Sequence, residues 1–440
     1  MSALPSSRRI VITGVGIISP LGNSKESLWA GLTSGKSGVT AYDDFGSDAA
    51  PSKFAAPARD FTGAIGDFGE LEKDQKKMIR KGLKLMCRET MMGVAVAQSA
   101  LQDAGITLGT HDPERSGCLF GTDYMLTMPE DFIAGIKACT DERGEFDYGR
   151  WGGTGLSHIT PLWLLRYLPN MPASHVAIYN DLRGPNNSLT LREAAANTVV
   201  GEAYFTIARG SADMIVVGAT GTRIRPMNAI HAMQQEETAN GDFAPEQASR
   251  PFDRDRSGMV LGEGAGAVIL EEYEIAKARN AHIYGEVVAR GSSTAVSPNS
   301  IADRRTALRN AISSTLKDAG LNPGDVGHIH AHGISTRSGD REEAAAIAEL
   351  FGDLDQQRPV TAAKSYFGNL GAGSGMVELI ASLLALEHGK LFPILNYEHA
   401  DPECPVAAVC RDDTSPGGSF VNLSVTPQAQ AASILVGAVA

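Results

Sequence analysis

Two histidines on one short segment are the side chains in this chain that most directly suggest chemistry. His330 and His332 alternate in the sequence HAH, and alternate residues of a strand point to the same face. Two imidazoles on one face can ligate a metal ion, but no third ligand with metal-site spacing follows close by. The pattern favours a core or surface role for His330 over ligation, and we expect neither a metal nor a cofactor.

Two glycine-containing segments come close to nucleotide-binding motifs. Gly31 and Gly35 precede a Lys-Ser pair, but three residues separate the glycines where a P-loop needs four to wrap a phosphate with backbone N–H groups. GVG at 14–16 lacks the third glycine of a dinucleotide fingerprint and lies inside a strand pattern. Neither segment predicts nucleotide binding.

A cluster of basic residues stands out against the formal net charge of −12. Such an acidic chain does not favour a nucleic-acid partner for the molecule as a whole. Charge runs on helices are usually solvated faces, and that alternative stays open beside a docking role. The cluster comprises Lys73, Lys76, Lys77, Arg80, Lys81 and Lys84.

Cysteine usage and hydropathy indicate a cytoplasmic protein. The five cysteines form no CxxC pair and are odd in number, so neither a disulfide framework nor a zinc site is expected. No signal peptide is recognisable, and no stretch of about 20 apolar residues predicts a membrane span. The cysteines are Cys87, Cys118, Cys139, Cys404 and Cys410.

The elements that would position these residues alternate between strands and helices, which predicts an α/β protein. Both halves show a similar rhythm, so we expect a duplicated unit, with halves at 1–263 and 264–440. An insertion near 123–175 is expected to pack over the core. Strands are predicted at 9–18, 117–122, 213–219, 266–271, 328–332, 419–425 and 433–439, and helices at 24–33, 73–105, 192–209, 306–320, 341–351 and 376–388.

Five segments, in order along nearly the whole chain, resemble the β-ketoacyl-acyl-carrier-protein synthases that elongate fatty acids and type II polyketides. The resemblance implies a thiolase fold of the α/β class. Two similar halves would form a five-layered α-β-α-β-α core, usually in a dimer. The segments are residues 8–39, GPNNSLTLREAAAN at 184–197, RPFDRDRSGMVLGEGAGAVILEE at 250–272, HAHGISTRSGDREEAAAI at 330–347 and KSYFGNLGAGSG at 364–375.

The resemblance also implies a chemistry and a partner. In the family a cysteine at a strand-to-helix turn takes the acyl chain as a thioester, because a helix N-terminus lowers the pKa of its thiol. Two histidines then assist decarboxylation of a malonyl thioester. The acyl donor is an acidic acyl carrier protein, and the family's docking surface lies near this chain's Lys76, Lys77, Arg80, Lys81 and Lys84.

The motif positions show where this chain departs from the family. Glu193 falls on the nucleophile position, and Asn369 falls on the position of the second histidine. His332 and Lys364 are retained, as is Glu343. An acyl-carboxylate anhydride would be far more reactive toward water than a thioester, so Glu193 cannot serve as the same acyl carrier. We expect Glu193 at the N-terminus of the helix, within reach of His332 and Asn369.

These site residues have structural alternatives. Glu193 could be a favourable acid near a helix N-terminus, or it could pair with His332 and keep that imidazole protonated. Lys364 could chiefly hold Glu343 in a buried ion pair. Asn369 could be a structural hydrogen bonder.

A last departure lies at 421–430. The family's Gly-rich turn there supplies an oxyanion donor, whereas this chain has Pro427, which lacks an N–H. The resemblance thus implies a non-condensing subunit, similar to a chain-length factor, that forms a dimer with an active ketosynthase or with itself. The alternatives are an enzyme of changed acid/base or decarboxylase chemistry on an acyl or malonyl thioester, or a non-catalytic acyl-chain binder.

Overall fold

The computed structural model describes residues 8–42, 52–354 and 356–439. Its strands form two sets of five with the same order, β5-β4-β6-β7-β1 and β10-β9-β11-β12-β8. Corresponding pairs are parallel or antiparallel alike, which reveals the duplicated unit. The strands are β1 (Ile10–Ile18), β4 (Ser116–Thr122), β5 (Asn186–Thr190), β6 (Met214–Thr222), β7 (Leu261–Glu272), β8 (Gly285–Thr294), β9 (His328–His330), β10 (Val360–Thr361), β11 (Ser419–Val425) and β12 (Gln430–Gly437), with the short β2 (Thr40–Ala41) and β3 (Phe54–Ala56) beside them.

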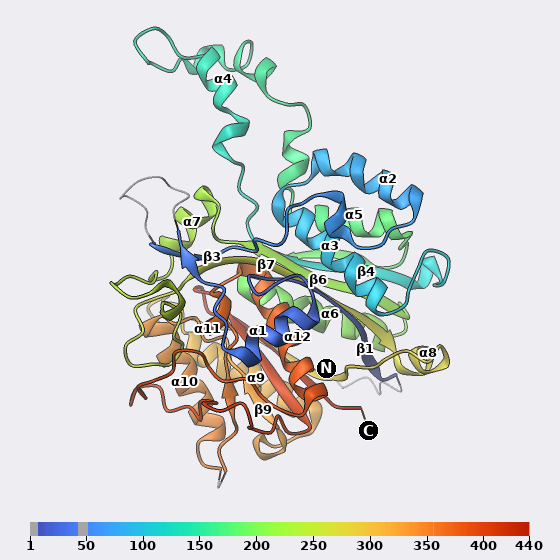
Figure 1. The fold of residues 1–440 in the computed structure, drawn as a ribbon, viewed down its shortest axis with the longest axis vertical. Coiled ribbons are helices and arrows are strands. Elements are labelled where there is room, and N and C mark those ends of the chain that lie inside the picture. The colour runs from blue at the N-terminus through green and yellow to red at the C-terminus, as the bar shows by residue number, and fades with distance from the viewer. Residues whose placement is uncertain (1–7, 43–51, 355, 440) are drawn as a thin grey trace.

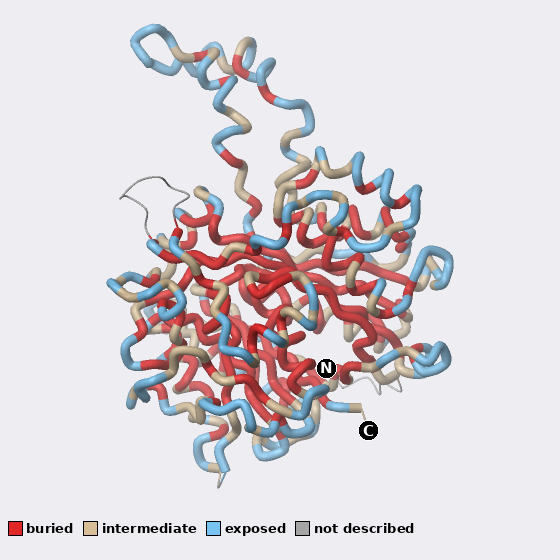
Figure 2. Tube along the Cα trace, in the orientation of Figure 1, coloured by how far each residue is buried: buried red, intermediate tan, exposed pale blue. Residues whose placement is uncertain are grey.

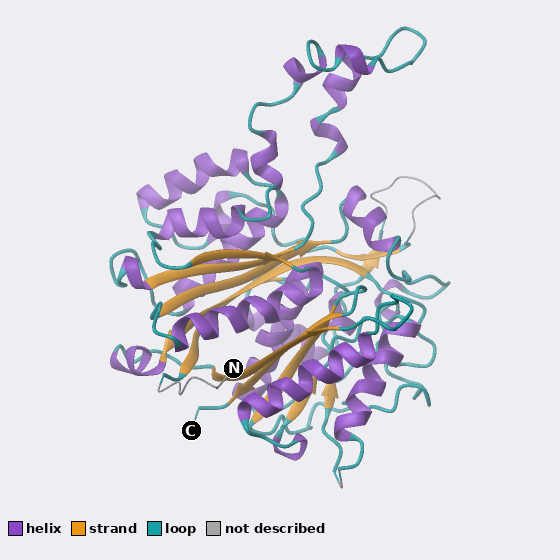
Figure 3. Cartoon of the chain, turned by 180° about the vertical axis from the view of Figure 1, so that it is seen from behind, coloured by secondary structure: helices purple, strands orange, loops and turns teal. Residues whose placement is uncertain are grey.

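The helices complete five layers, which confirms the predicted thiolase fold (Figures 1 and 3). Helices α2, α3 and α5 cover the first sheet, α6 and α12 lie between the two sheets, and α9 and α10 cover the second sheet. The helices are α1 (Lys25–Ser34), α2 (Lys73–Gly82), α3 (Arg88–Asp103), α4 (Ile133–Ala138), α5 (Met171–Asn180), α6 (Ala195–Ala208), α7 (Pro226–Met233), α8 (Tyr273–Ala278), α9 (Arg304–Ala319), α10 (Arg337–Phe351), α11 (Lys364–Phe367) and α12 (Ser374–His388).

The central helices are largely buried and mostly apolar because both of their faces meet a sheet. Val199, Val200 and Ile207 of α6 are fully buried, as are Leu379 and Leu383 of α12. A helix that is hydrophobic all round is typical of such a buried layer. The starts of α6 and α12 therefore lie deep in the molecule, where a polar group needs a partner.

The boundary predicted at 263/264 falls inside β7. The strand pairs with β1 up to Glu272 and with β6 up to Glu271, so its whole length belongs to the first sheet. The first half therefore extends through β7, and we place the division between β7 and β8.

The prediction that the insertion packs over the core is wrong. The segment between β4 and α5 projects from the body as an arm that includes α4 (Figures 1 and 2). Its aromatic residues pack on one another instead: the Phe132 ring lies 4.9 Å from Trp163 and 6.3 Å from Trp151. These contacts give the arm a small aromatic cluster of its own, separate from the main core.

The single helix predicted over 73–105 is two helices. Met86 and Cys87 are extended, so α2 ends at Gly82 and α3 begins at Arg88. A Cβ on Gly82 would lie 1.8 Å from the Tyr179 hydroxyl, so a larger residue at this position would displace the Tyr179 ring of α5. No helix within the described residues is long and apolar enough to cross a membrane.

Candidate functional site

Glu193 lies where the sequence places it, in the short turn Arg192–Ala194 that leads directly into α6. The turn follows β5, so the side chain enters the centre of the molecule from the carboxyl end of the first sheet. Arg192 has a φ of 54°, a left-handed conformation that side chains rarely adopt. Such strain persists where the surroundings hold it, and here it aims residue 193 inward.

An arginine that the sequence analysis did not identify is the main partner of Glu193. Nη2 of Arg223 lies 2.6 Å from Oε1 of Glu193 and 2.7 Å from Oδ2 of Asp123. Arg192 adds a longer contact, 3.5 Å from its Nε to Oε2 of Glu193. One guanidinium thus bridges two buried carboxylates.

The two carboxylates of this cluster differ in their pKa. Burial would raise the pKa of Glu193, but Arg223 and Arg192 outweigh it and hold that pKa well below its usual range. Burial raises the pKa of Asp123, and the Glu193 charge adds to this effect against the opposing charge of Arg223. Arg223 thus binds both carboxylates, and the arginines hold Glu193 in its ionised form.

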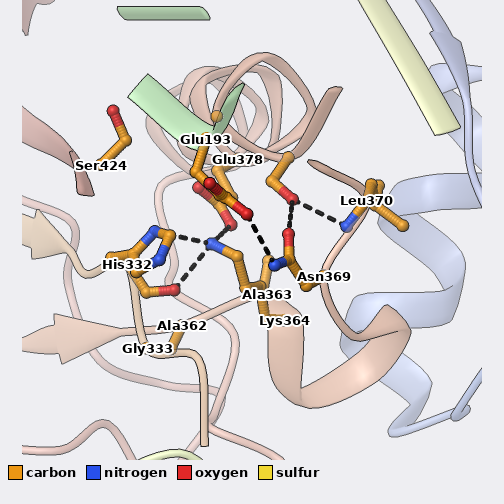
Figure 4. A network of polar contacts seen from close by, with 12 residues as sticks. Glu193, His332, Gly333, Ala362, Ala363, Lys364, Asn369, Leu370, Glu378 and Ser424 are labelled. Atoms are coloured by element: carbon orange, nitrogen blue, oxygen red, sulfur yellow. Dashed lines mark hydrogen bonds and ion pairs between the residues drawn. The ribbon is translucent and has the colours of Figure 1, made fainter. Parts of the chain in front are cut away.

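Asn369 also binds Glu193, as the sequence predicts (Figure 4). Its Nδ2 donates to Oε1 of Glu193 at 3.1 Å, and its Oδ1 accepts from Gly371 N at 2.9 Å and Ser374 Oγ at 3.2 Å. The amide thereby ties Glu193 to the beginning of α12. These contacts are those expected of a structural hydrogen bonder.

The predicted ion pair between Lys364 and Glu343 is wrong, because Lys364 pairs with Glu378 of α12 instead. Nζ of Lys364 also donates to His332 O at 2.7 Å and lies 3.2 Å from His332 Nδ1 (Figure 4). These three acceptors use all three protons of an ammonium group. Glu343 accepts the backbone N–H groups of His332 and Gly333, at 2.6 and 2.8 Å.

His332 is a neutral imidazole, so the alternative in which Glu193 keeps it protonated is wrong. Burial and then the charge of Lys364 lower the pKa of His332 well below its usual value, and the opposing effect of Glu193 is smaller. Since Nδ1 accepts from Lys364, the neutral ring carries its proton on Nε2. His332 can donate a hydrogen bond, but it is not poised as an acid.

The altered turn between β11 and β12 closes over Arg192. Ala429 N donates to Thr426 O at 2.9 Å, and Gln428 Oε1 accepts from Nη1 of Arg192 at 3.3 Å. Pro427 lies between them and has no N–H to offer. The turn thus holds the residue before Glu193 in place.

The candidate site is closed to solvent. Glu193 and Arg223 are each 1% exposed, and His332 is 3% exposed. An ionised carboxylate held by two arginines and an amide is a poor nucleophile and a poor base, because attack would break its ion pairs in a buried place. Oε2 of Glu193 and Nε of Arg223 make no hydrogen bond among the described residues, but both atoms are buried, so a substrate cannot reach them without a rearrangement.

Among the residues that the structure describes, one group of three carboxylate and histidine side chains is close enough together to hold a metal. Asp253, Asp255 and His399 bring ligand atoms within 4.8 Å of one another. Asp253 already accepts from Asp255 N at 2.8 Å and from His399 N at 2.7 Å, on its two different oxygens. Its hydrogen bonds organise the loop, so the group needs no metal.

The second predicted histidine, His330, has a core role. Its Nδ1 lies 2.7 Å from Ser382 Oγ, and its Nε2 accepts from Ala363 N at 3.2 Å. Burial lowers its pKa well below the usual value. His330 is thus a satisfied core histidine.

The basic cluster forms one exposed helical face. Six cations lie on α2 and the turn after it, and all of them are exposed. No ion pair involving these six is formed within the described parts of the chain, whereas Arg223 and Arg304 elsewhere each bridge two acids. The cations are Lys73, Lys76, Lys77, Arg80, Lys81 and Lys84.

The positions of Asp123 and Arg223 in the chain could have identified them as candidate site residues. Asp123 follows β4 directly, and Arg223 follows β6 directly. In α/β sheets, groups beyond the carboxyl ends of the strands gather at one crevice. Charged residues at both of these ends could have been predicted to meet near Glu193.

The chain belongs to the β-ketoacyl synthase family. The model of the N-terminal domain of this family matches residues 7–276, and that of the C-terminal domain matches residues 284–398. The chain is 33% identical, over 90% of each protein, to a 3-oxoacyl-[acyl-carrier-protein] synthase 2 of Synechocystis. It is 32% identical to a putative mitochondrial 3-oxoacyl-[acyl-carrier-protein] synthase of Schizosaccharomyces pombe, again over 90% of each.

Solved structures agree with this family and fold. A β-ketoacyl synthase from Burkholderia phymatum has a TM-score of 0.83 at 26% identity, and the ishigamide ketosynthase/chain length factor has 0.80 at 27%. Both alignments cover 98% of this chain and 100% of the other. A type II polyketide ketosynthase in complex with its acyl carrier protein shares the fold at 24% identity, with a TM-score of 0.80.

Proposed function

We propose that this protein is a non-condensing ketosynthase-like subunit of fatty acid or polyketide synthesis, resembling a chain-length factor. It acts beside a cysteine-bearing ketosynthase and an acyl carrier protein. The family membership supports the pathway class, and the ishigamide ketosynthase/chain length factor supplies a precedent among the similar structures.

The observation that carries this proposal is the ion pair between Glu193 and Arg223. Glu193 occupies the position that the motif assigns to the nucleophile, and its carboxylate is buried and already bound by Arg223 and Asn369. Acyl transfer from a thioester to a carboxylate would give an anhydride instead of a new thioester, and forming that anhydride would require the ion pair to break. The same feature argues against decarboxylation, because a malonyl group would have to reach a carboxylate that is 1% exposed and bound by two arginines.

A partner chain is supported by two surfaces on the same side of the first sheet. β5 is the terminal strand of that sheet in the described part of the chain, and its residues are exposed or half-buried. An open strand edge is a template for another chain. The neighbouring arm exposes large apolar side chains of the kind that gather in interfaces: Ile133, Ile136, Phe146, Tyr148, Leu156, Leu162 and Leu164.

The basic face of α2 supports docking of the carrier. Its six exposed cations form no ion pair with any described residue and are complementary to a strongly acidic protein, and electrostatic attraction of this kind raises association rates. The complex of a type II ketosynthase with its acyl carrier protein shows that a protein of this fold can bind such a partner.

The proposal is tested by incubating the isolated chain with acyl- and malonyl-carrier proteins and recording intact masses. We expect no acyl adduct and no loss of carbon dioxide from the isolated chain. With a cysteine-bearing ketosynthase added, we expect a complex and products whose length depends on this subunit. A stable acyl adduct on Glu193, or turnover by the isolated chain, would refute the non-condensing role.

A further inference from the structure

A separate cavity lies where the arm leaves the body, at the beginning of α3. It has a volume of about 290 Å³, and it is lined by the residues around the start of α3, by both ends of the arm and by Arg225. Four of the lining residues contain sulfur: Met86, Cys87, Met91 and Met128. The cavity is therefore rich in side chains that soft metal ions prefer.

Two sulfur atoms come together at the wall of this cavity. Sγ of Cys87 lies 3.9 Å from Sδ of Met125, although the two residues are 38 positions apart in the chain. If metal–sulfur bonds are about 2.3 Å long, as in zinc–thiolate sites, this separation corresponds to an S–metal–S angle of roughly 115°. Such an angle suits a metal ion with three ligands in a plane.

Thr90 supports this pair of sulfur atoms. Its Oγ1 lies 3.4 Å from Sγ of Cys87 and 4.0 Å from Sδ of Met125. Once the thiol has lost its proton, the hydroxyl can donate to the sulfur, and donors of this kind behind a ligand strengthen metal binding. Cys87 also directly precedes the first turn of α3, where a helix N-terminus favours a thiolate.

Glu89 is a buried carboxyl group that lacks a bound cation. It is 6% exposed, lines the same cavity and forms no ion pair among the described residues. Its carboxylate lies within hydrogen-bonding reach of the Cys87 thiol, whereas the charge of Arg225 acts on it without direct contact. Buried carboxylates are normally paired, so this group points to a cation bound beside Cys87.

The other charges around the cavity select among metal ions. Arg88 and Arg166 line it but are already paired with Glu263 and Asp131, and Arg225 is the third guanidinium group. A monovalent ion that replaces the thiol proton leaves the net charge unchanged, whereas a divalent ion adds a positive charge among three arginines. Thiolate and thioether ligands favour Cu(I) among the transition metals.

We propose that Cys87 and Met125 bind Cu(I), with a third ligand from the methionines that line the cavity. The S–H bond of Cys87 breaks, a copper–sulfur bond forms, the proton leaves to solvent and copper stays in the +1 state. Burial raises the pKa of the Cys87 thiol, so the metal-free protein holds the proton that is released. The cysteine spacing does not predict this site because its other ligands are methionines. The site is independent of the non-condensing role proposed above.

The experiment is competition for Cu(I) between the full-length protein and the coloured chelator bicinchoninate, under anaerobic and reducing conditions. We expect the wild type to hold one equivalent of Cu(I) and to release one proton for each ion bound, followed with a pH indicator. Cys87→Ala should lose this equivalent. Thr90→Val keeps the shape of the side chain and should weaken binding roughly tenfold, and Met125→Leu should weaken it more because it removes a ligand.

Cys410→Ala is the matched control, because Cys410 is an exposed free cysteine outside the cavity. It should keep the full equivalent, and loss of binding in this variant would overturn the proposal in favour of adventitious binding at a surface thiol. Unchanged affinity in Cys87→Ala would also overturn it. If Cys87→Ala does not fold, Met125→Leu decides, and an affinity equal to that of the wild type then refutes the site.

A parallel titration with Zn(II) tests the choice of metal. We expect Zn(II) to bind more weakly than Cu(I), because it adds a positive charge beside the arginines and prefers ligands other than thioethers. Zn(II) bound by Cys87 as tightly as Cu(I), and lost in Cys87→Ala, would overturn the assignment to a monovalent ion.

Discussion

The two halves of the molecule share a strand order, but the groups at the ends of their strands differ. The first half brings Asp123, Arg223 and Glu193 together, and the charges of these groups satisfy one another. The second half brings His332 and Lys364 together with Glu378 of α12, and its imidazole stays neutral. One half has become an internal ion cluster, while the other keeps a hydrogen-bond framework.

Under the proposed non-condensing role, the difference shows how a fold can outlast a reaction. The helices and sheets that aim residue 193 at the centre are intact, because they are held by the apolar layers around α6 and α12. The reacting groups occupy a small volume at the helix starts, and replacing them leaves those layers unchanged. Substitutions that remove the charged or titratable groups of one half at a time measure what each half contributes to stability and to activity.

The largest effect is expected from Arg223→Met. The substitution leaves Glu193 and Asp123 buried without their shared cation, which we expect to cost about 3–5 kcal/mol of unfolding free energy. Chemical denaturation measures it. Adding Glu193→Gln and Asp123→Asn should recover most of the loss, because the amides carry no charge. Unchanged stability of Arg223→Met would show that the cluster is not the stabilising element of the first half.

The next effect concerns the nucleophile. Glu193→Cys should permit only slow acylation, on the order of 10²–10³-fold below an intact ketosynthase, because Asn369 and the Pro427 turn leave the stabilising groups incomplete. Intact-mass kinetics with an acyl-carrier protein measure the rate. Glu193→Cys with Asn369→His should be faster than the single variant. Full condensing activity from Glu193→Cys alone would show that both other changes are harmless.

A pH dependence is expected from the buried histidines of the second half. Burial lowers the pKa of His328 to about 4, so the unfolded chain binds a proton more readily than the folded chain below pH 6.5. Its contribution to stability is full above that pH and falls as the pH approaches 4. At pH 4.5 the loss is about 2–3 kcal/mol from this histidine.

The matched variant is His328→Asn. It should flatten the dependence of the unfolding free energy on pH between 7 and 4.5, measured as a slope so that any constant destabilisation cancels. An identical slope in wild type and variant would mean that His328 does not resist protonation in the folded protein.

The smallest effect is expected on the surface. Lys77→Glu with Lys81→Glu should weaken binding of an acidic carrier protein roughly tenfold at low salt and less at 0.1 M salt and above, because exposed charges are screened over about 10 Å at 0.1 M. Fluorescence anisotropy across a salt series measures it. Arg305→Glu on α9 is a control at a distant exposed cation. If wild type and the double variant bind the carrier protein with equal affinity at every salt concentration, the basic face of α2 is only a solvated surface.

Local pattern was enough to predict much of this molecule. Buried strands and helices came from runs of apolar residues, and ordered motifs placed Glu193 before α6 and Asn369 near its carboxylate. The break between α2 and α3 was missed because neither Met86 nor Cys87 is a residue type that usually ends a helix. The arm was misplaced because its aromatics could equally have packed on the core.

The sequence by itself determined which groups were absent, since no thiol stands in the motif around residue 193 and no second imidazole stands at 369. Only the tertiary structure decided what replaced them. Arg223 is 30 residues from Glu193, and Glu378, not Glu343, proved to be the partner of Lys364. Ion pairing depends on distances of a few ångströms and on exclusion of water. Those distances are set by how the layers pack, which no local pattern encodes.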